Sequence, residues 1–107
     1  MIIDAHVHML THPDYDEKII REARRLKIDK VCLLAGHPEV EMWGAYMAPN
    51  ESVLKAYEKF PEQIIPFGFF DLGADTPELV DQLHRAGFKG IKFTRARKNY
   101  DDKSFYP

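Results

Sequence analysis

The chain opens with MIIDAHVH (residues 1–8), and the interpretation of the whole fold starts from this stretch. Residues 2–7 are short, apolar and rich in β-branched side chains, which predicts a strand. Alternate residues of a strand share a face, so Asp4, His6 and His8 are expected together on one face, with only apolar side chains on the other. This purely apolar face predicts packing beneath helices.

Composition places the chain among ordinary globular proteins. It has 107 residues, 45% hydrophobic and 30% charged, with a net charge of −2, so we expect one domain and neither nucleic acid nor a membrane as partner. Asp4 interrupts the only candidate for a secretory signal. Cys32 is the only cysteine, which excludes a disulfide within one chain. We therefore expect a cytoplasmic protein.

Strand and helix patterns alternate along the chain. Three segments have apolar residues at helical spacing with polar residues between them, and four short apolar runs read as strands. Such alternation predicts an α/β fold of about four parallel strands joined by three right-handed helical crossovers. The expected strands are 2–7, 30–36, 64–70 and 88–94, and the expected helices are 16–26, 50–60 and 76–86.

Several residues predict where these elements begin and end. Asn50 and Thr76 are suited to capping the second and third helices, and Gly87 is suited to ending the third. Acidic groups at Asp14 and Asp16 favour the start of the first helix. Pro66 cannot donate to a sheet ladder, so we expect it near the start of its strand or at an irregularity.

The two histidines of the opening strand have two interpretations. Imidazoles at positions i and i+2 can converge on one point, and neutral imidazole is a common ligand of zinc and similar ions. They could equally be hydrogen-bonded core residues or partly solvated side chains at the end of the strand. The same-face Asp4 and the position in a series of βα units, whose strand C-termini normally hold the site, favour metal binding.

The residues Asp4-Ala-His-Val-His8 resemble the signature of the amidohydrolase superfamily. Residues 87–93 and 99–107 are similar to the fourth-strand region of its amidohydrolase-related branch. The resemblance implies a partial (β/α)8 TIM barrel, with residues 1–107 as a single segment forming the N-terminal half. It also implies that His6 and His8 bind a divalent metal, most simply zinc. In the family, the remaining ligands follow strands five, six and eight.

The activity implied by the resemblance is metal-dependent hydrolysis of a small molecule. A metal-activated water would attack a carbonyl-type substrate. A metal-dependent decarboxylase of the same branch is the alternative, and a non-catalytic α/β assembly module, with structural histidines, is another. A related metal-dependent nuclease is disfavoured by the net charge and by the basic fourth-strand segment. With two histidines alone, the isolated chain is expected to be inactive.

Three residues are expected to contact substrate: Lys92, Arg95 and Trp43. Lys92 could instead be carboxylated and bridge two metals, as in some subgroups of the superfamily, or pair with an acid such as Asp4. Arg95 belongs to a short basic cluster suited to a carboxylate or phosphate, or simply to solvent. Trp43 lies in the long loop 36–49, which could cover a ligand or pack as a hydrophobic flap.

Other candidate residues have plainer interpretations. His12 and His84 are expected in a loop and on a helix surface, Cys32 as a small buried side chain, and Asp71 at the correct strand end but suited to capping a turn.

Four strands would leave both edges of the sheet unpaired. We expect one of three outcomes: a fragment of a longer enzyme, a homo-oligomer formed through the exposed strand edges, or an open and poorly stable α/β layer. The fragment is the favoured expectation.

Overall fold

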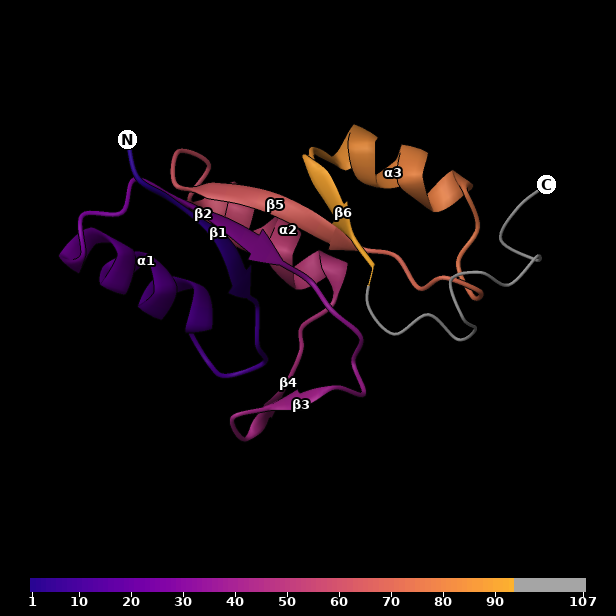
Figure 1. Cartoon of the computed structure of the whole chain (residues 1–107), viewed down its shortest axis with the longest axis horizontal. Helices are drawn as coiled ribbons and strands as arrows, with labels where there is room; N and C mark the ends of the chain where they lie inside the picture. Colours follow the sequence, from indigo (N-terminus) through magenta and orange to yellow (C-terminus); the bar gives the residue numbers. More distant parts are fainter. Residues whose placement is uncertain (94–107) are drawn as a thin grey trace.

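The computed structural model of the chain describes residues 1–93, and residues 94–107 lie outside this description. The chain alternates between strands and helices as its sequence predicts (Figure 1). No helix within residues 1–93 is long and apolar enough to cross a membrane. The elements are β1 (Ile3–His8), α1 (Tyr15–Arg25), β2 (Lys30–Leu34), β3 (Glu41–Met42), β4 (Ala45–Tyr46), α2 (Asn50–Lys59), β5 (Ile64–Phe69), α3 (Glu78–Ala86) and β6 (Gly90–Lys92).

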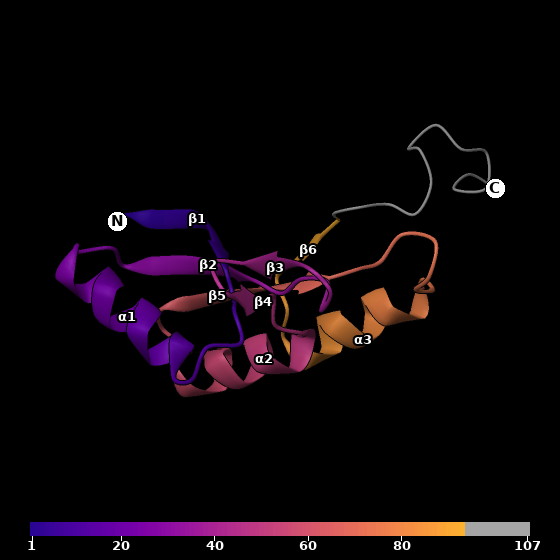
Figure 2. The ribbon, with the colours of Figure 1, turned by 90° about the horizontal axis from the view of Figure 1, so that it is seen from below.

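The main sheet has four parallel strands in the order β1-β2-β5-β6. Figure 2 shows α1, α2 and α3 together on one side of this sheet. The predicted α/β class, with four parallel strands and three helices, is confirmed. In the described part of the chain the sheet is open, with β1 and β6 as its outer strands, and it does not close into a barrel.

The core lies between the sheet and the helices. Ile20 and Ala23 of α1, and Val53 and Ala56 of α2, are buried against alternate residues of the inner strands. In each helix these two residues are three positions apart and lie on the same side, which is why each helix buries one face only. The strand residues in this core include Val31, Leu33 and Ile64.

The helix starts differ from the sequence prediction in detail. The cap of α2 is Pro49, and the cap of α3 is Pro77; neither makes a side-chain cap hydrogen bond. Asn50 is instead the first residue of α2, and its side chain contacts β5. Gly87 ends α3 in the left-handed conformation, with φ of 111°, as predicted.

Pro66 lies in the middle of β5 and is fully buried. β5 is an inner strand, where proline is unusual because it cannot donate to a neighbouring strand. Its carbonyl accepts a hydrogen bond from the amide of Lys89, which comes just before β6 begins at Gly90. The N–H and C=O of one strand residue point to the same side. The missing donor of Pro66 therefore faces a place where the neighbouring strand has not yet started.

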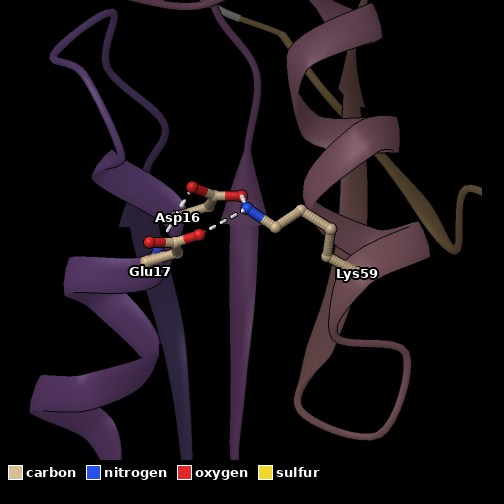
Figure 3. Close-up of polar contacts among 3 residues, drawn as sticks. All are labelled: Asp16, Glu17 and Lys59. Atoms are coloured by element: carbon tan, nitrogen blue, oxygen red, sulfur yellow. Dashed lines mark hydrogen bonds and ion pairs between the residues drawn. The ribbon is translucent and has the colours of Figure 1, made fainter.

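An ion-pair cluster joins the first two helices on the outer side of the molecule (Figure 3). The ammonium of Lys59, in the last turn of α2, lies 3.0 Å from carboxylate oxygens of both Asp16 and Glu17, in the first turn of α1. These contacts raise the pKa of Lys59, mainly through its hydrogen bonds to the two carboxylates. Acidic groups at the start of one helix and a cation at the end of the next also suit both helix dipoles.

A register shift in β1 changes one expectation about the opening stretch. Asp4 lies opposite Val31, but Val7 lies opposite Leu33, so β1 contains one extra residue between them. Residues directly opposite each other share a face of a sheet. Asp4 is therefore aligned with the helix-facing row, and its carboxylate accepts a hydrogen bond from the backbone N–H of His6. The prediction that Asp4 shares a face with both histidines is wrong.

Candidate functional site

Polar side chains gather at the carboxyl ends of the four parallel strands. His8 ends β1 and Lys92 ends β6. His37 follows β2, and Asp71 follows β5. In parallel α/β folds, loops at this edge normally supply the functional groups, since the strand ends all open in one direction.

The rings of His6 and His8 point toward one another. Their Nε2 atoms are 3.0 Å apart, and the rings meet edge to face with centroids separated by 4.6 Å. His6 is exposed and His8 is half-buried. The predicted convergence of the two imidazoles on one point is therefore present in the structure.

The separation of these two nitrogens fits two ligands of one ion. Nitrogens about 2.05 Å from a zinc ion lie about 2.9 Å apart at a right angle and about 3.3 Å apart at the tetrahedral angle. The same separation also fits a hydrogen bond between a protonated and an unprotonated Nε2. Within residues 1–93, no three His, Cys, Asp or Glu side chains are grouped closely enough to hold a metal. The pair thus fits part of a metal site but does not complete one.

Lys92 reaches across the open face of the sheet from the opposite outer strand. Its Nζ lies 3.2 Å from Nδ1 of His8. A charged ammonium can only donate, so Nδ1 of a neutral His8 then accepts and its proton lies on Nε2, from which it donates to His6. This proton arrangement gives a hydrogen-bonded chain from Lys92 through His8 to His6.

Metal binding requires a different proton arrangement. A metal held by both Nε2 atoms needs the His8 proton on Nδ1, facing Lys92. Lys92 can accept a hydrogen bond from Nδ1–H of His8 only as a neutral amine. As an ammonium it has no acceptor and must move away from His8. The state of Lys92 therefore decides whether His8 is available as a ligand.

The surroundings of His8 and of Lys92 favour the neutral form of each side chain. Burial lowers the pKa of His8, with smaller contributions from the charges of Lys92 and His6. Burial also lowers the pKa of Lys92. A neutral imidazole is the form that binds metals, and a neutral amine is the form that can react with carbon dioxide or accept a hydrogen bond.

His37 and Asp71 form a second polar pair at the same edge. Nε2 of His37 lies 3.8 Å from a carboxylate oxygen of Asp71, whose residue is only 8% exposed. Nδ1 of His37 accepts the backbone N–H of Glu39, which leaves the ring proton on the nitrogen that faces Asp71. The His37 ring also packs against Phe69. This pair places the start of the 36–49 segment beside the end of β5.

The pairing of His37 with Asp71 and the contact of Asn50 with β5 were not predicted from the sequence. The amide oxygen of Asn50 accepts the N–H of Phe69 at 2.7 Å, and its amide nitrogen donates to the carbonyl of the same residue at 3.2 Å. The positions of His37 and Asp71 immediately after neighbouring strands were a signal that the two could meet. The Asn50 contact had no comparable signal, because a helix cap explained the residue equally well.

The long loop predicted for residues 36–49 contains a small hairpin, β3-β4. Trp43 and Gly44 form its tip, and both have positive φ, which suits the twist of a two-residue hairpin turn. The hairpin packs through Ala45 and Met47 against Leu10, beyond β1. Trp43 is 77% exposed, and no contact among the described residues joins it to His6, His8 or Lys92.

The structure describes three of the four remaining candidate residues. Arg95 lies outside the described residues, so the substrate contact expected of it stays a prediction. His84 is exposed on α3, as expected, and His12 stacks on Tyr15. Cys32 is half-buried, and burial together with the charge of Asp4 raises the pKa of its thiol, which makes it a poor nucleophile.

Comparison with known proteins adds no assignment to this geometry. Scans of the chain against protein-family models, curated proteins and solved structures find no match.

Proposed function

We propose that this chain provides the metal-binding half of a metal-dependent hydrolase of the amidohydrolase-related type. In this proposal the four parallel strands are half of a (β/α)8 barrel, and the uncovered face of the sheet is the barrel interior. His6 and His8 are two ligands of a divalent metal, with zinc as the simplest choice. The observation that carries the proposal is the 3.0 Å approach of their Nε2 atoms at the carboxyl edge of the sheet.

The arrangement of strands and helices supports this placement. Strand order follows chain order, and all three helices lie on one side of the sheet, as in a (β/α)8 barrel. The D-A-H-V-H motif then ends the first strand, where ligands project from the rim. A bound divalent metal would activate a water molecule for attack on a carbonyl-type substrate.

The residues of this chain have separate roles in the proposal. His6 and His8 bind the ion through Nε2, and the His8 proton then lies on Nδ1, so a charged Lys92 must move away from this ring. Once it has moved, the charged Lys92 can contact an acidic group of the substrate. The His37–Asp71 pair holds the hairpin segment that borders the same edge. Hydrolysis is favoured over decarboxylation as the simplest use of a metal-bound water.

Metal content after dialysis tests the ligand assignment. The purified chain should bind zinc weakly, because two histidines leave the ion short of protein ligands. His6→Ala combined with His8→Ala should abolish this binding, whereas His12→Ala combined with His84→Ala should leave it unchanged. Zinc should also raise the melting temperature of the wild type and not of the first double variant.

Two results would contradict the proposal. Zinc binding that survives loss of His6 and His8 would remove the ligand assignment. A melting temperature that neither zinc nor a chelator changes, in the wild type and in the double variant alike, would favour the non-catalytic module with structural histidines.

A further inference from the structure

The two outer strands of the sheet have exposed apolar residues. Ile2 and Ile3, at the start of β1, are 56% and 46% exposed, and Phe93, directly after β6, is 52% exposed. Among residues 1–93, no further strand pairs with β1 or β6, so each outer strand has backbone donors and acceptors without a strand partner. Exposed apolar side chains and backbone groups without strand partners therefore favour the binding of another strand at both edges.

Within residues 1–93, no helix covers the face of the sheet opposite α1, α2 and α3 (Figure 2), although Leu34 and Phe69 are buried near its carboxyl edge. Cys32 lies opposite Ile65, and both side chains are half-buried. The residues before and after each of them in the strand point to the helices and are buried. Phe67, in the next row of β5, is half-buried too. Parallel sheets are normally covered on both faces, and the part of the chain that the structure describes supplies helices to one face only.

The two edges carry opposite charges. Asp4 is exposed on β1, and Lys89 is exposed immediately before β6. An edge that presents a carboxylate is complementary to an edge that presents an ammonium, and it is unsuited to pairing with a copy of itself.

We propose that a second copy of this chain covers the uncovered face by closing an eight-stranded barrel. A two-fold axis parallel to the strands places β6 of each copy beside β1 of the other, with all eight strands parallel. Both new contacts are then identical, as two-fold symmetry requires. This inference rests on the half-barrel of the proposed function, and it names the second copy as the source of the other four strands.

The closed arrangement accounts for the features of both edges and of the face. Eight strands enclose an interior just wide enough for side chains to fill, so Ile65, Phe67 and Cys32 become core residues. No strand edge remains exposed, and the helices stay on the outside. The second copy also brings its own His6 and His8 to the same interior.

Sedimentation equilibrium across a concentration series tests the proposal. The wild-type chain should have twice the 12.5 kDa mass of one chain. Ile3→Lys on one edge, or Phe93→Lys on the other, should each raise the dissociation constant about tenfold or more, because either change affects both contacts. Leu26→Lys, an equally exposed apolar-to-lysine change at the end of α1, should leave the dimer intact. Circular dichroism checks folding, and Phe93→Lys tests the contact if Ile3→Lys does not fold.

Mixing the two edge variants gives a sharper result. A heterodimer of Ile3→Lys with Phe93→Lys has one contact free of substitutions and one with two lysines. The mixture should therefore dimerise more strongly than either variant alone. A dimer formed by β1 pairing with β1 would instead be insensitive to Phe93→Lys, and this result would overturn the proposal.

A monomeric wild-type chain at every concentration would also overturn the dimer. The outcome is independent of the metal assignment, because the His6→Ala and His8→Ala variant should dimerise normally without binding zinc. A monomer that binds zinc through these histidines rejects the dimer alone, and a dimer that binds no zinc rejects the metal site alone.

Discussion

Nζ of Lys92 lies 3.2 Å from Nδ1 of His8, although the two residues belong to opposite outer strands of the sheet. The other nitrogen of the same ring faces Nε2 of His6. One imidazole thus connects a lysine with the second candidate ligand. A positive charge on that lysine and a metal ion at the two histidines compete for the same ring.

Replacing Lys92 should therefore strengthen metal binding. Lys92→Met keeps the apolar stem and removes the ammonium, which frees His8 to carry its proton on Nδ1. We expect the zinc affinity measured by isothermal titration to rise about tenfold, which corresponds to about 1.4 kcal/mol. Lys89→Met removes an exposed charge just before the start of β6 and should change the affinity little.

Weaker zinc binding after Lys92→Met would mean that Lys92 supports the metal rather than competing with it. Carboxylation would explain that result, because it converts the amine to an anion. A mass increase on adding bicarbonate and zinc together would identify it.

Stability should fall in mild acid because of His8. Its pKa is lowered from the usual 6.5 in the folded chain, so below that pH the unfolded chain binds more protons than the folded chain. The free energy of unfolding then decreases as the pH falls from the unfolded toward the folded pKa. Melting of the chelator-treated chain between neutral and mildly acidic pH should show this loss.

His8→Gln should make the pH profile flatter, whereas His84→Gln, at an exposed position on α3, should leave its shape unchanged. An identical slope in the His8→Gln variant would show that other groups account for the acid sensitivity.

Asn50 should contribute to stability as a tie between α2 and β5. Asn50→Ala leaves both backbone groups of Phe69 without the side-chain partner they have now. We expect a loss of about 1–3 kcal/mol in urea unfolding. Asn50→Asp keeps the acceptor and should lose less, and Glu51→Ala should stay within about 0.5 kcal/mol. Equal effects for Asn50→Ala and Glu51→Ala would mean that the tie adds nothing.

Much of the fold could be predicted because local patterns and packing agree. The stripe containing Ile20 and Ala23 corresponds to the buried face of α1, and most of the apolar run at residues 30–36 is buried in and just after β2. Parallel order follows from the alternation of strands and helices. The helix caps were less predictable, since Asn50 suits both a cap and a contact with a distant strand. Only the position of β5 beside α2 decides between these two.

The candidate site was predictable where it depends on neighbours in sequence. Two residues in one strand place His6 and His8 together, so their convergence could be foreseen. Asp4 could not be placed correctly, because a single extra residue in β1 changes the alternation and leaves no sequence signal. The approach of Lys92 to His8 depends on how four strands are arranged, which spacing along the chain does not encode.

The most direct test of the central claim measures the imidazole nitrogens themselves. Long-range proton–nitrogen NMR spectra of the labelled chain, recorded before and after adding zinc, report each ring nitrogen separately. The account predicts that the Nε2 signals of His6 and His8 move together to values typical of metal-bound imidazole, while those of His84 stay in place. Unchanged Nε2 signals for His6 and His8, or changes confined to other histidines, would contradict it.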